Sequence, residues 1–124
     1  MGVNIKKLKE TIEELKSDLG DGLKATDIWH AADGESIVGY NAQPKASALF
    51  NQVNRFLIKT LKESDYPGIG NFRLLQLENN HVSMSIFAGD YQMGMLIDLA
   101  KINMGILMSV AYPKALKGLQ EATE

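Results

Sequence analysis

Several residue types and patterns are missing from this chain, and each absence excludes a class of protein. The 124 residues contain no cysteine, which excludes disulfide bonds, thiolate metal ligands and a cysteine nucleophile. No apolar run reaches the roughly 18 residues that a bilayer-spanning helix needs. The Lys- and Glu-rich first 19 residues do not resemble a signal peptide. We therefore expect a cytoplasmic protein with no membrane insertion.

The chain also lacks a marked excess of charge of either sign. It has 13 basic and 15 acidic residues, and the net charge is −2. This balance gives no overall attraction to nucleic acid, and basic residues do not interleave with the strand aromatics Phe72 and Phe87. We therefore expect no nucleic-acid partner.

Groups for catalysis are scarce. The two histidines, His30 and His81, fall within and at the start of predicted strands, and no nucleophile–base–orienter set can be built around them. Two histidines without a helical His-x-x-x-His spacing do not make a zinc site. The sequence therefore predicts no catalytic residues, no metal site and no cofactor, and hence no enzyme.

What is present is an ordered series of periodicities in a chain of one-domain length. Residues 5–19 carry apolar side chains three and four apart and predict a helix that ends at Gly20 and Gly22. Residues 25–40 predict a β-hairpin with a two-residue type I′ turn at Asp33-Gly34. Residues 72–78, 81–88 and 91–99 predict three antiparallel strands joined by short turns. The third of these runs is apolar on both sides, so we expect a central strand with helices on both faces of the sheet.

A long helix is predicted after Pro44 and extends to about Glu63. Its apolar residues form one stripe, which we expect to face the core; they are Ala46, Leu49, Phe50, Val53, Phe56, Leu57 and Leu61. A second side is basic without any acid, formed by Lys45, Gln52, Arg55, Lys59 and Lys62. This side is either simply solvated or a surface for a partner. Ile58 lies apart from the stripe, beside Ser47, Asn51 and Asn54, a composition suited to a helix–helix seam.

The last helix is predicted to begin at Asn103, whose side chain can cap it. Pro113 interrupts the pattern, so we expect a kink or a break near Tyr112. The pattern does not distinguish the two.

The order helix-strand-strand-helix-strand-strand-strand-helix resembles the roadblock family, which includes the roadblock-type dynein light chain and small regulators of Ras-like GTPases. The resemblance covers about residues 5–120 of a single domain spanning 1–124. It rests on the hairpin Ile28–Val38, the long second helix and Asn103-Met104-Gly105, which is similar to the family's Asn-x-Gly opening of the last helix. It implies an α+β, profilin-like fold with a five-stranded antiparallel sheet. It also implies a non-enzymatic homodimeric scaffold that binds a small Ras-like GTPase or a larger protein assembly.

The strand at 72–78 should be an edge, and pairing it with its copy across a two-fold axis would cover that edge. We expect dimer contacts from Ser47, Phe50, Asn54, Ile58, Leu61, Leu74 and Gln76. The basic side of the long helix would then face the GTPase. Two alternatives remain open, a PAS-like ligand-sensing domain and a profilin- or longin-like adaptor. The sequence does not name the GTPase, the pathway, or whether the protein stimulates hydrolysis or only scaffolds.

Overall fold

The elements of the chain follow the predicted order. The computed structural model describes residues 2–124. The elements are α1 (Ile5–Leu19), the 3-10 turn η1 (Gly20–Gly22), β1 (Leu23–His30), β2 (Ser36–Tyr40), α2 (Ala46–Glu63), β3 (Phe72–Gln76), β4 (His81–Ala88), β5 (Tyr91–Asp98), α3 (Met104–Ile106), the π-helical segment η2 (Leu107–Ala111) and α4 (Tyr112–Ala122). Within the described residues no helix is long and apolar enough to cross a membrane.

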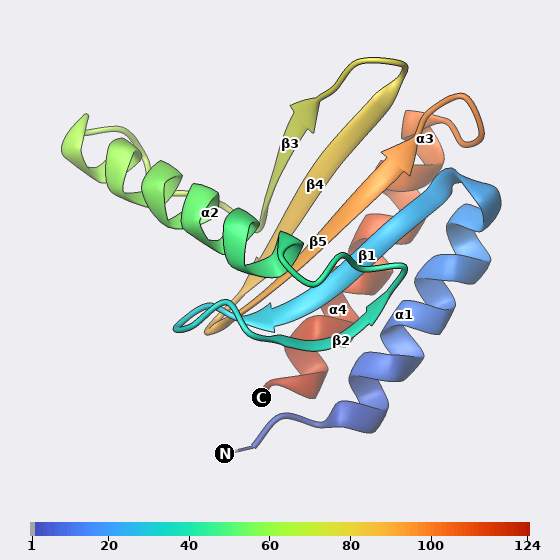
Figure 1. Cartoon of the computed structure of the whole chain (residues 1–124), viewed down its shortest axis with the longest axis horizontal. Coiled ribbons are helices and arrows are strands. Elements are labelled where there is room, and N and C mark those ends of the chain that lie inside the picture. Colours follow the sequence, from blue (N-terminus) through green and yellow to red (C-terminus); the bar gives the residue numbers. More distant parts are fainter. Residues whose placement is uncertain (1) are drawn as a thin grey trace.

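The five strands form one antiparallel sheet in the order β2-β1-β5-β4-β3 (Figure 1). β5 is central, as its two apolar sides predicted, and pairs with β1 and β4. β3 lies at one edge and pairs only with β4, in the register Leu74 opposite Met84. The predicted α+β fold, with helices on both faces of the sheet, is confirmed.

One face of the sheet packs against α1 and α4 and forms the hydrophobic core (Figure 1). Alternation along β4 points Val82, Met84 and Ile86 to this face. The helices contribute apolar residues at helical spacing, among them Leu8, Ile12, Leu15, Leu19, Leu107, Ala115 and Leu119, all buried. The stripe predicted for the first helix therefore faces the core.

The two helices on this face approach each other closely at Gly118 of α4. A Cβ at this position would overlap Thr11 Oγ1 on α1 and would lie 2.9 Å from Thr11 Cγ2. Glycine is therefore needed here for close packing, although it is a poor helix former.

The hairpin between β1 and β2 forms, but its turn differs from the predicted one. The loop spans five residues, 31–35, and only Gly34 has a positive φ (71°). Gly34 N donates to His30 O at 2.8 Å, and Asp33 Oδ1 accepts from Glu35 N at 2.9 Å. The Asp33 side chain thus closes the loop as an Asx turn instead of occupying a type I′ turn.

The C-terminal helix begins at the predicted cap, where Asn103 Oδ1 accepts from Ile106 N at 2.8 Å. The helix does not end at Pro113. It widens into the π-helical segment Leu107–Ala111 immediately before it. Because Pro113 has no N–H and its ring crowds the carbonyl one turn earlier, a locally wider helix accommodates it.

Candidate functional site

α2 lies on the opposite face of the sheet, in an orientation that the sequence did not predict. The residues it buries are Ser47, Asn51 and Asn54, at 3%, 4% and 0% exposure. The expectation that its apolar stripe faces the core is wrong, because Leu49 and Phe56 are 57% and 68% exposed. The physical reason lies in the sheet, where Trp29, Gln92 and Arg73 offer hydrogen-bond partners to this side of α2.

That face and α2 share a buried network of amide hydrogen bonds. Gln92 Oε1 accepts from Trp29 Nε1 at 3.0 Å and from Asn54 Nδ2 at 2.9 Å. Asn51 Oδ1 also accepts from Trp29 Nε1, at 3.2 Å, and Arg73 Nε donates to Asn54 Oδ1 at 2.7 Å. We call Asn51 and Asn54 the amide spine of α2. A network satisfied in this way fixes which side of the helix meets the sheet.

Two charged groups on this face are incompletely paired. Burial lowers the pKa of the Arg73 guanidinium, and its Nη2 has no hydrogen-bond partner. Asp27 is 6% exposed, and burial raises the pKa of its carboxyl although Ser36 Oγ donates to its Oδ1. Asp27 Oδ2 has no partner. Both groups weaken the packing of this face compared with an apolar core.

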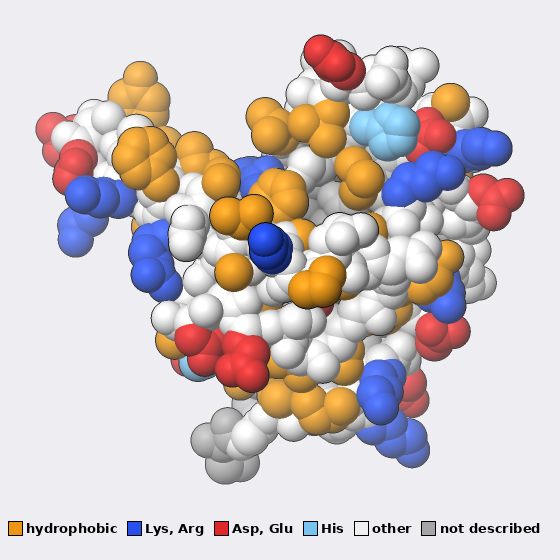
Figure 2. Space-filling model, viewed as in Figure 1, with side chains coloured by type: hydrophobic (Ala, Val, Ile, Leu, Met, Phe, Trp, Pro, Cys, Tyr) orange, Lys and Arg blue, Asp and Glu red, His pale blue; other side chains and the backbone are white. Residues whose placement is uncertain are grey.

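The apolar side of α2 is open to solvent. It is formed by Leu49, Val53 and Phe56, which are 57%, 44% and 68% exposed. In Figure 1 the C-terminal part of α2 extends past the edge strand β3. On β3, Leu75 (49% exposed) pairs opposite Ser83 and lies on the α2 face, whereas Leu74 (38% exposed) pairs opposite Met84 and lies on the face of α1 and α4. Figure 2 shows hydrophobic side chains gathered along α2 and beside it, over the strands. Contiguous exposed apolar surface of this kind marks an interaction site.

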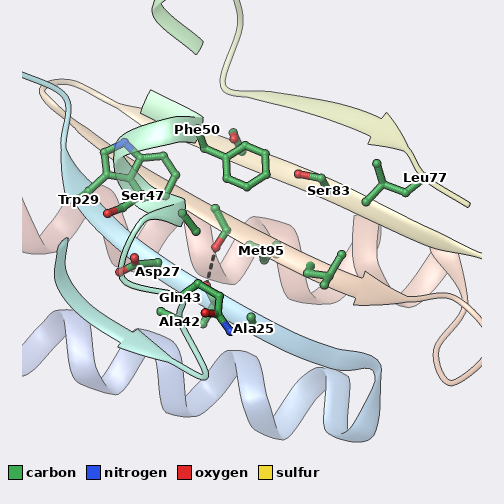
Figure 3. A pocket seen from close by; sticks show the side chains of 15 residues that line it. Ala25, Asp27, Trp29, Ala42, Gln43, Ser47, Phe50, Leu77, Ser83 and Met95 are labelled. Atoms are coloured by element: carbon green, nitrogen blue, oxygen red, sulfur yellow. Dashed lines mark hydrogen bonds between the residues drawn. The ribbon is translucent and has the colours of Figure 1, made fainter. Parts of the chain in front are cut away.

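A cavity of about 330 Å³ opens between α2 and the sheet, on the side of α2 that carries Phe50 (Figure 3). Its lining includes small side chains, such as Ala25 on β1 and Ser83 on β4, together with the larger Phe50 and Leu77. On α2 the cavity is lined by Ala46, Ser47 and Phe50, and Phe50 lies between the amide spine and the apolar side of the helix.

The basic side of α2 is exposed at every predicted position: Lys45, Gln52, Arg55, Lys59 and Lys62. Arg55 differs from the lysines because its Nη2 donates to Ala31 O at 3.0 Å and to Ala32 O at 3.2 Å. Arg55 therefore anchors α2 to the β1–β2 loop.

The residues predicted for the dimer interface divide into two groups. Phe50, Ile58, Leu61, Leu74 and Gln76 are partly or largely exposed. Ser47 and Asn54 are buried against the chain's own sheet, so their expected role as contacts to a second copy requires correction. Leu49, Val53, Phe56 and Leu75 were not in the predicted set, since an apolar stripe on a helix ordinarily indicates a core.

The two histidines, His30 and His81, have different neighbours and do not form a shared site. His81 Nδ1 lies 2.8 Å from Asn79 O, and His30 Nδ1 lies 4.0 Å from Asp33 Oδ1. Among residues 2–124 no group of three or more His, Asp or Glu side chains is arranged to hold a metal ion.

Solved structures share this architecture at low sequence identity. Myxococcus xanthus MglB matches with a TM-score of 0.81 at 11% identity, covering 98% of this chain and 90% of that chain. MglB with tetrameric arrangement matches with a TM-score of 0.75 at 12% identity, covering 98% and 94%. A Roadblock/LC7 domain from Streptomyces avermitilis matches with a TM-score of 0.59 at 7% identity, covering 87% and 90%. No family model and no curated protein matches the sequence.

These likenesses define the class of fold. The chain has the roadblock fold, as the order of its elements predicted, and it follows the MglB structures over nearly its whole length.

Proposed function

We propose that the chain is a non-enzymatic homodimeric scaffold of the cytoplasm that binds a small Ras-like GTPase. The observation that carries the proposal is the apolar side of α2, which lies exposed next to the unpaired edge of β3. An isolated chain that exposes both features is prone to aggregation. A two-fold axis beside β3 would pair the edge with its copy and bring the two apolar surfaces together.

The proposed interface retains the exposed members of the predicted set and adds the α2 residues that the structure exposes. Its members are Leu49, Phe50, Val53, Phe56, Ile58 and Leu61 on α2 and Leu74, Leu75 and Gln76 on β3. One MglB structure has a tetrameric arrangement, which supports self-association on this fold.

The GTPase is proposed from the resemblance to the roadblock family and from the basic side of α2. Two copies would present two such sides, each with Lys45, Lys59 and Lys62 exposed. Charges at the rim of an interface steer a partner and select it more than they add affinity. The protein itself would contribute no catalytic group. Arg55 donates to the carbonyls of Ala31 and Ala32, which disfavours a role for it as an arginine finger inserted into the GTPase active site.

The partner test uses a Ras-like GTPase from the same organism, loaded with GDP or with a non-hydrolysable GTP analogue. We expect the dimer to bind one nucleotide state preferentially. The double substitution Lys59→Glu and Lys62→Glu should weaken binding about tenfold or more, because it reverses the rim charge. Arg55 is left unchanged so that the β1–β2 loop stays anchored.

A matched control reverses two exposed lysines on α1, Lys6→Glu and Lys9→Glu, on the other face of the sheet. The control should bind as the parent does. Equal binding by the Lys59/Lys62 variant, with the dimer intact, would show that the basic side is only solvated.

A further inference from the structure

α2 presents its amides to the sheet although it carries a larger apolar surface. Successive residues of a helix are about 100° apart. Ser47, Asn51 and Asn54 therefore share one side, and Phe50, Leu57 and Leu61 share a neighbouring side less than a quarter of a turn away. These three apolar residues are only half-buried. A small rotation of α2 would turn them toward the cavity and the sheet.

Such a rotation would separate matched polar groups. Asn54 Nδ2 would leave Gln92 Oε1, now at 2.9 Å, and Asn54 Oδ1 would leave Arg73 Nε, now at 2.7 Å. Asn51 Nδ2 would leave Ala31 O, now at 3.0 Å. Arg73 Nε would then have no hydrogen-bond partner, Gln92 Oε1 would keep only Trp29 Nε1, and the two amides would lose these bonds, which is unfavourable in a buried site. The sheet thus favours one rotation of α2, and that rotation leaves the apolar side outside.

We infer that the amide spine, Asn51 and Asn54, prevents α2 from turning Phe50, Leu57 and Leu61 into its own sheet. It thereby keeps the cavity open and the apolar side (Leu49, Val53 and Phe56) fully outside, available to a second copy of the chain. The inference rests on the proposed homodimer, because this surface lies next to the unpaired β3 edge. Buried polar residues in coiled coils act similarly: they lower stability, but they exclude helix registers in which the polar groups would lack partners.

The first experiment compares dimer dissociation constants by sedimentation equilibrium. In the variant Asn51→Leu with Asn54→Leu, α2 is free to turn inward, and we expect the dissociation constant to rise at least about tenfold. The control, Gln52→Leu with Lys59→Leu, adds the same two leucines on the exposed basic side and should leave the dissociation constant near that of the parent.

A second variant serves if the first does not fold. Asn54→Leu with Arg73→Met removes both members of the 2.7 Å hydrogen bond and leaves Gln92 accepting from Trp29. Replacing both partners of a buried bond is tolerated better than removing one. This variant should also weaken the dimer.

The orientation of α2 is measured separately, because the cysteine-free chain allows a single label. In a Val53→Cys background diluted until every sample is monomeric, thiol labelling should slow several-fold in the spine variants and stay unchanged in the Gln52/Lys59 control.

An unchanged dissociation constant together with unchanged labelling would overturn the inference while leaving the dimer in place. A parent chain that is monomeric at micromolar concentration would overturn the proposed dimer and the use of this surface by a second copy together. If labelling of Val53→Cys were nevertheless slower in the spine variants than in the parent, the amide spine would still be shown to set the rotation of α2 about its axis.

Discussion

Replacing Phe56 by alanine tests the exposed side of α2 without disturbing the monomer. Phe56 is 68% exposed, so its removal leaves no cavity in the folded chain. The free energy of unfolding of the isolated chain should change by no more than about 0.5 kcal/mol, as for other surface substitutions.

The effect on the dimer follows from the area that Phe56 can bury. A phenylalanine buries about 150–250 Å² when fully enclosed. Phe56 is 68% exposed, so roughly 100–170 Å² of its surface is still open to solvent in the monomer and can be buried by a second copy. At about 25 cal/mol per Å², burying half of that area in each of two copies contributes about 2.5–4 kcal/mol to the dimer. Phe56→Ala should therefore raise the dissociation constant roughly 100- to 1,000-fold.

Sedimentation equilibrium on the parent, on Phe56→Ala and on a control measures this effect. The control is Ile5→Ala on α1, which removes a 40% exposed apolar side chain from the opposite face of the sheet. The control should dimerise as the parent does. If Phe56→Ala dimerises with the parent's dissociation constant, the apolar side of α2 is not the interface and the area argument fails.

Two further predictions concern the two faces of the sheet. Gly118→Ala should destabilise the chain by about 1–3 kcal/mol in chemical unfolding, because a methyl group overlaps Thr11; adding Thr11→Ala should recover most of the loss, and a variant that is stable without it would contradict the close packing of α1 on α4. Burial raises the pKa of Asp27 above its ordinary 3.8, so folding favours the protonated carboxyl and the parent should lose stability as pH rises above about 3.8 through the raised pKa. Asp27→Asn should remove that loss while Asp90→Asn, at an exposed site, keeps it; identical pH profiles for the parent and Asp27→Asn would show that burial does not shift this carboxyl.

The sequence predicted the sheet well because strand patterns and short turns act locally. The alternation of Val82, Met84 and Ile86 with Ser83 and Ser85 assigned one apolar and one polar face to β4. The turns after β3 and β4 then made the three strands neighbours. The hairpin loop was predicted less accurately, because Asp-Gly suits both a type I′ turn and the longer Asx-closed loop.

The rotation of α2 could not be predicted from its own periodicity. Its stripe has the spacing of a core-facing helix, and only the groups opposite it decide which side is buried. Those groups are Trp29, Gln92 and Arg73, which lie on three different strands. The signal present in the sequence was the serine-bearing face of β4, which needed polar cover. The interface on α2 and β3 therefore stays a prediction, and two of the residues predicted for it, Ser47 and Asn54, are buried against the chain's own sheet.

The molar mass of the parent chain tests the central claim most directly. Light scattering on the purified protein at micromolar concentration should give twice the 13.7 kDa of one chain, because the proposed dimer would cover the apolar side of α2 and the β3 edge. A mass of one chain under the same conditions would contradict the account.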